Sequence, residues 1–132
     1  MPFGTATVVT TVGKGITTGR LIGATPSQAE PKYVAMGVGA TGAGRTAAVG
    51  DTALSTQVET RTAGTSTQVT TSTANDTFQN VGTITATATR AVDESGLFDA
   101  SSAGNMFTSA TFAVANLNSG DSIQFTWKVQ YT

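Results

Sequence analysis

Apolar and polar side chains alternate without a break near the C-terminal end of the chain, in residues 121–132. Successive side chains of a β-strand point to opposite faces, so this period of two is what a half-buried strand requires. The single Trp of the chain lies on the apolar face of the segment. We therefore predict a strand at the centre of a sheet, and its inward-facing residues are Ile123, Phe125, Trp127, Val129 and Tyr131.

The composition of the whole chain is that of a β-protein. Thr, whose branched side chain suits a pleated sheet, supplies 27 of the 132 residues, and 15 Gly punctuate the chain. A disordered Ser/Thr-rich linker would share this composition but would lack the apolar alternation. We predict an all-β, antiparallel β-sandwich or jelly-roll-like domain over residues 31–132, with one short helix and an extended N-terminal arm over residues 1–30.

Turn residues and apolar periodicity divide this domain further. Leu97 and Phe98 follow a predicted turn at residues 93–96 and should anchor it in the core, where Phe112 and Trp127 are also expected. The other predicted turns are at residues 75–76 and 118–121. The predicted strands lie at residues 33–38, at 77–90 and around Met106, Ala110, Phe112 and Val114. Residues 65–73 are polar on both faces, which predicts either an edge strand or a mobile loop.

One segment of the domain has a helical pattern. Leu54 and Val58 are four residues apart and would share one helix face, and Asp51 is a suitable N-cap. We therefore predict the short helix over Val49–Arg61. Glu59 and Arg61 would then face outward, and Arg61 and Arg90 are candidates for ion pairs with Glu59 or Glu94.

The N-terminal region has a different pattern. Residues 5–12 and 16–22 read as two extended segments joined by Gly13, Lys14 and Gly15, which predicts a hairpin. Neither segment has a strongly apolar face, so we interpret residues 1–30 as an arm that docks on another subunit or on a partner protein. The candidate interface residues are Phe3, Val8, Val9, Val12, Ile16, Leu21 and Ile22.

The charged and reactive residues exclude several functions. The seven Lys and Arg are scattered and the net charge is −1, which argues against a nucleic-acid surface and against an anionic membrane surface. No apolar run approaches the length of a membrane span, and no signal-peptide pattern is present. The chain contains no His and no Cys, so Ser-His and Cys-His catalysis is excluded and zinc lacks its usual ligands. We expect no enzymatic activity, no cofactor and no small-molecule substrate.

Two segments could still suggest a site. The Gly-rich run at residues 37–45 lacks the Lys-Ser/Thr ending of a phosphate-binding loop. Asp93, Glu94 and Asp99 could bind a hard cation through oxygen ligands, although their spacing matches no calcium loop and a solvated turn is the alternative.

Four stretches resemble a family of small virion proteins of tailed bacteriophages. They are YVAMGVGATG, VGDTALSTQVETR, ESGLFDASSAGNMFTSATF and GDSIQFTWKVQYT, and they fall between Lys32 and the end of the chain. The resemblance implies a virion part without enzymatic activity. Within this family we favour a head decoration, or cement, protein. The resemblance then implies that the protein is made in the host cytoplasm and sits on the outer surface of the phage head as a homotrimer. It also implies that the protein binds the major capsid protein and bridges capsomers.

Two alternatives remain open from the sequence. The first is a structural protein associated with the phage tail or fibre. The second is a β-sandwich module that binds a glycan or a receptor. A glycan-binding module would depend on an exposed aromatic side chain, whereas a decoration protein would bind the intact capsid lattice.

Overall fold

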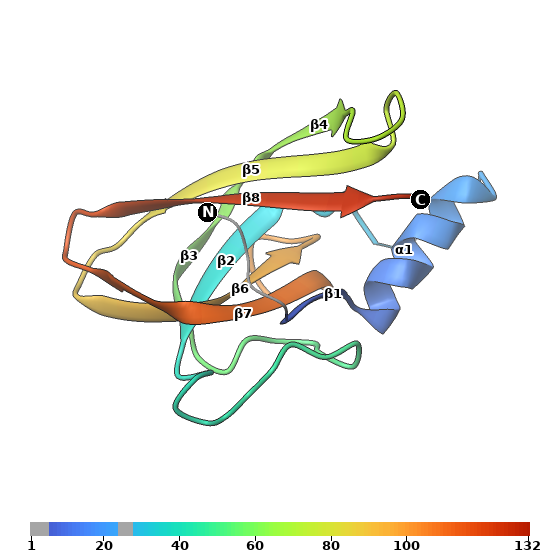
Figure 1. The fold of residues 1–132 in the computed structure, drawn as a ribbon. Coiled ribbons are helices and arrows are strands. Elements are labelled where there is room, and N and C mark those ends of the chain that lie inside the picture. The colour runs from blue at the N-terminus through green and yellow to red at the C-terminus, as the bar shows by residue number, and fades with distance from the viewer. Residues whose placement is uncertain (1–5, 24–27) are drawn as a thin grey trace.

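The computed structural model describes residues 6–23 and 28–132, and in this part of the chain it contains two antiparallel sheets and one helix (Figure 1). The all-β sandwich predicted from the sequence is confirmed. The elements in chain order are β1 (Ala6–Val9), α1 (Thr11–Leu21), β2 (Tyr33–Val38), β3 (Gln57–Ala63), β4 (Thr65–Val69), β5 (Thr77–Thr85), β6 (Arg90–Phe98), β7 (Met106–Leu117) and β8 (Ser122–Gln130).

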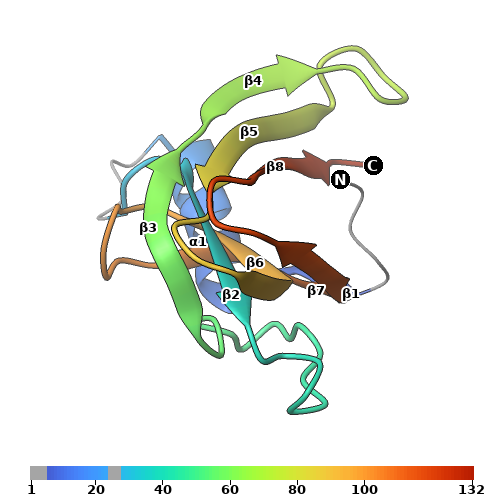
Figure 2. The same cartoon turned by 90° about the vertical axis from the view of Figure 1, so that its left-hand side faces the viewer.

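The two sheets meet where β3 runs directly into β4. One sheet has five strands in the order β1-β7-β6-β2-β3, and the other has three in the order β4-β5-β8. The chain turns the corner between them at Gly64, as Figure 2 shows. A Cβ atom at Gly64 would lie 2.2 Å from Oδ1 of Asn80, so the corner requires a residue without a side chain.

The main core lies between the inner faces of the two sheets. Phe125 and Trp127 of β8 are buried there, and the ring of Phe112 lies 6.1 Å from that of Phe125. Leu97 is also part of this core. The remaining predicted anchor, Phe98, is buried in a second, smaller cluster with Ala35, Leu54 and Met106.

The helix is not where the sequence predicts it. The expected hairpin over residues 5–22 is wrong, because only Ala6–Val9 is a strand and Thr11–Leu21 is helical. The β-branched residues and glycines of this segment favour a strand locally. The helix forms nevertheless because Thr10 caps it and Ile16 is buried against the core.

The helix predicted over Val49–Arg61 is also wrong, because residues 57–63 form β3 and pair with β2. Asp51 does not cap a helix, since its carboxylate accepts hydrogen bonds from the amide of Ala48 and the hydroxyl of Ser109. Leu54 and Val58 pack in different clusters, so they do not share a face.

The predicted turn at residues 93–96 is wrong as well. These residues lie in the middle of β6, where Asp93, Glu94 and Ser95 are buried. Acidic residues are typical of turns, but here protein donors bind their carboxylates, which permits burial in a strand. The strand predicted over 77–90 ends at Thr85, and residues 86–89 make the turn into β6.

The C-terminal strand is found where the alternation places it, but not at the centre of a sheet. Among the described strands β8 pairs with β5 alone, so it is an edge strand and β5 is central. Trp127 is buried by the facing sheet and not by a position between two strands. The predicted edge strand β4 and the turns at 75–76 and 118–121 are present.

Candidate protein-interaction surface

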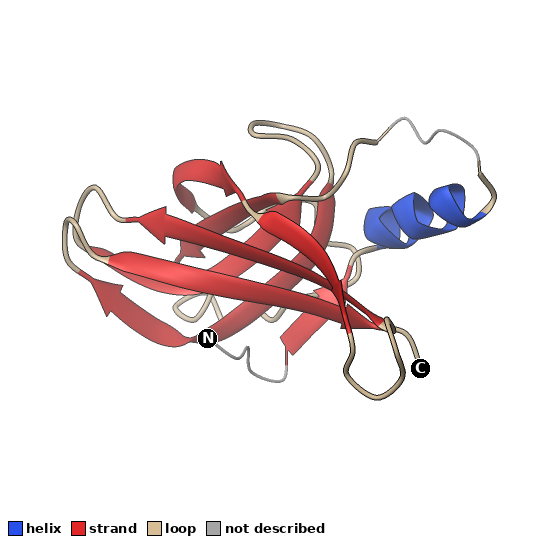
Figure 3. Cartoon of the chain, turned by 90° about the horizontal axis from the view of Figure 1, so that it is seen from above, coloured by secondary structure: helices blue, strands red, loops and turns tan. Residues whose placement is uncertain are grey.

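The helix α1 lies at one end of the sandwich (Figure 3), and Figure 1 shows the C-terminal end of β8 beside it. Its sequence is a poor helix former, because it contains Gly13, Gly15 and Gly19, and each Gly costs about 1 kcal/mol relative to Ala. It has 11 residues, and isolated helices of this length are marginal. Tertiary contacts must therefore hold it in place.

These contacts are concentrated at the first turn of α1. The buried hydroxyl of Thr10 accepts a hydrogen bond from the amide of Gly13 at 3.0 Å, and the amide of Thr10 donates to the carbonyl of Phe107 in β7. A Cβ atom at Gly13 would lie 2.3 Å from that same carbonyl oxygen, so the close approach of α1 to β7 depends on glycine. The amide of Thr11 donates to the carbonyl of Val49 at 2.7 Å.

The other end of α1 exposes two large apolar side chains. Leu21 is 80% exposed and the adjoining Ile22 is 79% exposed. Single exposed apolar side chains are normal on a protein surface, but adjacent ones at the mouth of an apolar hollow mark an interaction site. The structure places such a hollow beside Leu21, which lines it, and Ile22 is the next residue in the chain.

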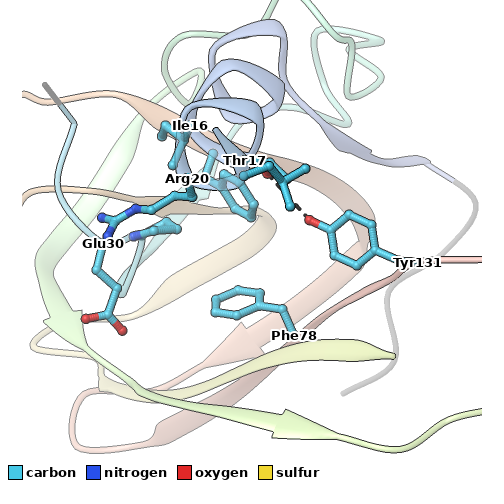
Figure 4. A pocket seen from close by; sticks show the side chains of 9 residues that line it. Ile16, Thr17, Arg20, Glu30, Phe78 and Tyr131 are labelled. Carbon is cyan, nitrogen blue, oxygen red and sulfur yellow. Dashed lines mark hydrogen bonds between the residues drawn. The ribbon is translucent and has the colours of Figure 1, made fainter. Parts of the chain in front are cut away.

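The hollow is a groove of about 510 Å³ between α1 and the ends of β5, β7 and β8 (Figure 4). The rings of Phe78 and Phe107 meet edge to face on its floor, with their centres 6.0 Å apart. The hydroxyl of Tyr131 lies 3.5 Å from that of Thr17, across the groove. Its lining residues, mostly apolar, are Ile16, Thr17, Arg20, Leu21, Glu30, Pro31, Phe78, Phe107 and Tyr131.

A second, more polar hollow of about 390 Å³ continues from this groove over β4. The two share Glu30, Phe78 and Tyr131. The polar half adds hydroxyl, amide and carboxylate groups, among them Gln68 and Asp76. Together the halves form an amphipathic depression across one end of the molecule.

Asp76 organises the loop that borders the polar half. Although desolvation raises the pKa of Asp76, the backbone amides of Thr73, Thr71 and Ser72 and the side chain of Gln130 lower it well below its usual range. The carboxylate therefore holds this loop in one conformation and is already satisfied by protein donors.

Two opposite charges lie on the rim of the apolar groove. Arg20 is exposed on α1 and Glu30 is exposed just before β2. The ion pairs found between described residues join Arg45 to Asp51 and to Glu94, and Arg90 to Glu59, so neither rim residue takes part in one.

The carboxylates of β6 hold the long loop of residues 39–56. Asp93 accepts hydrogen bonds from the amides of Ala40 and Thr41, the latter at 2.7 Å. Glu94 is fully buried, forms an ion pair with Arg45 at 2.6 Å and accepts a hydrogen bond from the amide of Thr56. The register shift between Val92 and Glu94 interrupts the alternation of β6, and both neighbouring carboxylates reach the same loop.

This arrangement accounts for the candidate cation ligands and ion pairs. Asp93, Glu94 and Asp99 each bind protein donors, with Asp99 accepting from the amide and side chain of Asn105, and no metal-binding group of three or more acidic residues is found in residues 6–23 and 28–132. Of the two candidate partners, Arg90 pairs with Glu59, whereas Glu94 pairs with Arg45.

Arg61 does not pair with Glu59 or Glu94. Its guanidinium stacks on the ring of Phe98, 3.4 Å from the ring centre, and donates hydrogen bonds to the carbonyls of Ala100 and Ala103. Arg61 therefore holds the loop between β6 and β7.

The predicted interface residues fall into three groups. Phe3 lies outside the described residues. Ile16 is buried in the core, and Val8, Val9 and Val12 are half-buried. Leu21 and Ile22 are exposed, so they are the predicted residues that remain available to a partner.

The sequence gives no signal for the rest of the surface. Phe78, Phe107 and Tyr131 belong to three different strands or strand ends, and Arg20 and Glu30 are isolated charges in the sequence. Only the fold brings them around one groove.

Comparisons of the chain with protein-family models, with curated proteins and with solved structures find no match. No helix in the described part of the chain is long and apolar enough to cross a membrane.

Proposed function

We propose that this protein is a non-enzymatic structural protein of a phage virion, a head decoration protein that binds the outer surface of the capsid and bridges capsomers. The resemblance of residues 32–132 to small virion proteins suggests this class. The observation that carries the proposal is the exposed pair Leu21 and Ile22, of which Leu21 lines the apolar groove. A surface of this kind is typical of a protein that works by contact with other proteins.

The energetic argument rests on the same pair. Burial of a large apolar side chain contributes about 1.5–3 kcal/mol, so covering both Leu21 and Ile22 is a substantial share of the binding free energy of an interface. On a capsid, many copies bound to the folded shell and not to its dissociated subunits would stabilise the assembled state by mass action.

The direct test is cosedimentation of the purified protein with capsids that lack it. We expect saturable binding, and we expect the double variant Leu21→Ser/Ile22→Ser to weaken it. The matched control is Val49→Ser/Val114→Ser, which removes two other exposed apolar side chains, 50% and 44% exposed, away from the groove. Folded wild-type protein that does not bind capsids, or equal binding by both double variants, would argue against the proposal.

A second candidate function is favoured by the polar half of the depression. Tyr131 is an aromatic side chain, 54% exposed, next to amide and carboxylate groups, a combination that suits a sugar ring. A glycan-binding module would bind a glycan array and lose binding in Tyr131→Ala. Tail association, the other alternative, would be indicated by binding to tails and not to heads.

A further inference from the structure

The rim of the apolar groove is self-complementary. It carries one cation, Arg20, and one anion, Glu30, and neither forms an ion pair between described residues. It also carries Leu21, an apolar side chain that lines the groove and is 80% exposed. In an isologous contact the same patch faces itself across a two-fold axis, so residue i meets residue j and j meets i.

From this we infer that a second copy of the chain covers the groove in a two-fold dimer, in place of the homotrimer that the resemblance implies. Arg20 of each copy lies opposite Glu30 of the other, and the Leu21–Ile22 pairs pack between them. The inference rests on the proposed function in one respect, namely that the α1 end is a protein interface. It adds that the partner at this interface is a second copy of the chain. Each copy then contacts the capsid through another surface. The Leu21–Ile22 pair contributes to capsid binding indirectly, because pairing makes the bound protein bivalent.

The charges favour a second copy over other occupants. An apolar peptide would leave Arg20 and Glu30 without counter-charges, and a glycan would leave Leu21 and Ile22 uncovered. A copy of this chain supplies the cation, the anion and the apolar pair from one patch.

Charge reversal gives a test that needs no capsid. Arg20→Glu makes the rim wholly negative and Glu30→Arg makes it wholly positive, so each variant alone places like charges across the axis. We expect each to weaken self-association by at least about tenfold, measured by analytical ultracentrifugation over a concentration series. An equimolar mixture of the two variants should associate again, because a negative rim then faces a positive one.

The matched control is Lys14→Glu, which reverses another exposed charge on α1 that does not line the groove and should leave association unchanged. The double variant Arg20→Glu/Glu30→Arg should associate like the wild type. Leu21→Ser/Ile22→Ser should be monomeric whether the rim carries its native charges or the reversed ones. Circular dichroism and thermal melting confirm that each variant is folded.

Three results would overturn the inference: a wild-type protein that stays monomeric at all concentrations, self-association that is indifferent to both single reversals, or no recovery in the mixture. These results are separable from failure of the proposed function. A monomeric protein that binds capsids contradicts the inference alone, and a charge-dependent dimer that does not bind capsids contradicts the proposed function alone.

Discussion

The α1 end and the loop of residues 39–56 differ in how firmly the rest of the fold holds them. The helix is regular, yet it contains three glycines and its second half leaves Leu21 and Ile22 uncovered. The loop contains no helix or strand, yet Asp93 and Glu94 of β6 hold its backbone and its Arg45 at several points.

The difference teaches that regular secondary structure is not what fixes a segment in this protein. Side-chain partners in the sheets do so, and they are dense under the loop and sparse at the far end of α1. A segment with few internal partners is suited to bind an external one. Each variant below changes one of the two regions, and a matched variant serves as its control.

The largest effect should follow removal of the charge that holds the loop. Glu94 is fully buried against Arg45, so Glu94→Gln removes the buried one of the two carboxylates that pair with this largely buried guanidinium and leaves only Asp51. We expect the free energy of unfolding to fall by about 3 kcal/mol, measured by urea denaturation. Glu30→Gln, on the exposed rim of the groove, is the control and should change stability little. Equal effects of the two variants would show that the loop is not held by this pair.

Gly37→Ala tests the same contact through packing. A Cβ atom at Gly37 would lie 2.6 Å from Oε1 of Glu94, and Glu94 cannot move away without losing Arg45. We expect a loss of about 1–3 kcal/mol in the free energy of unfolding. Gly42→Ala lies in the loop of residues 39–56, with open space around its Cβ position, and should be nearly neutral. If Gly37→Ala were as mild as the control, the packing around Glu94 would be looser than described.

Replacement of Gly15 in α1 should raise the free energy of unfolding and not lower it. The Cβ position of Gly15 is open, so Gly15→Ala should stabilise the protein by about 0.5–1 kcal/mol through helix propensity. Gly13→Ala is the paired variant, and it should destabilise because its Cβ would meet the carbonyl oxygen of Phe107. Thermal melting of both variants checks the signs, and a loss of stability in Gly15→Ala would mean that its face of α1 is already covered.

The smallest effect should be at Asp76, which holds the loop between β4 and β5 in the way that Asp93 holds the loop of residues 39–56. The pKa of Asp76 lies below its ordinary value of 3.8 in the folded state, so its contribution to stability is fully present above that value and is lost as the pH falls further. We expect Asp76→Asn to be less stable than the wild type at pH 7, and the gap between their melting temperatures to narrow below about pH 4. If the difference in melting temperature did not change with pH, the lower stability of Asp76→Asn would have a cause other than loss of the ionised carboxylate.

Part of this architecture could be predicted from the sequence. The strand β8, its preceding turn and the all-β class follow from alternation and turn residues, which are local signals. The position of α1 does not, because Ile16 and Gly13 meet β7 only in the folded chain. The burial of Asp93 and Glu94 could not be predicted either, because their partners lie 38–53 residues away in the sequence.

The interaction surface was only partly predictable for the same reason. Leu21 and Ile22 were expected at an interface because the N-terminal segment is weakly patterned, and they are exposed, though on a helix and not on an extended arm. The groove beside them joins residues from both ends of the chain, and no local pattern indicates that Tyr131 meets Thr17.

Amide hydrogen exchange tests the central contrast most directly. In dilute protein we expect the amides of residues 17–22, in the second half of α1, to exchange much faster than those of Ala40, Thr41 and Thr56, which donate to buried carboxylates. At concentrations where the protein self-associates, or on the capsid, residues 17–22 should become protected. Exchange from α1 in dilute protein as slow as from the loop would contradict the account, because the helix would then be held without any partner.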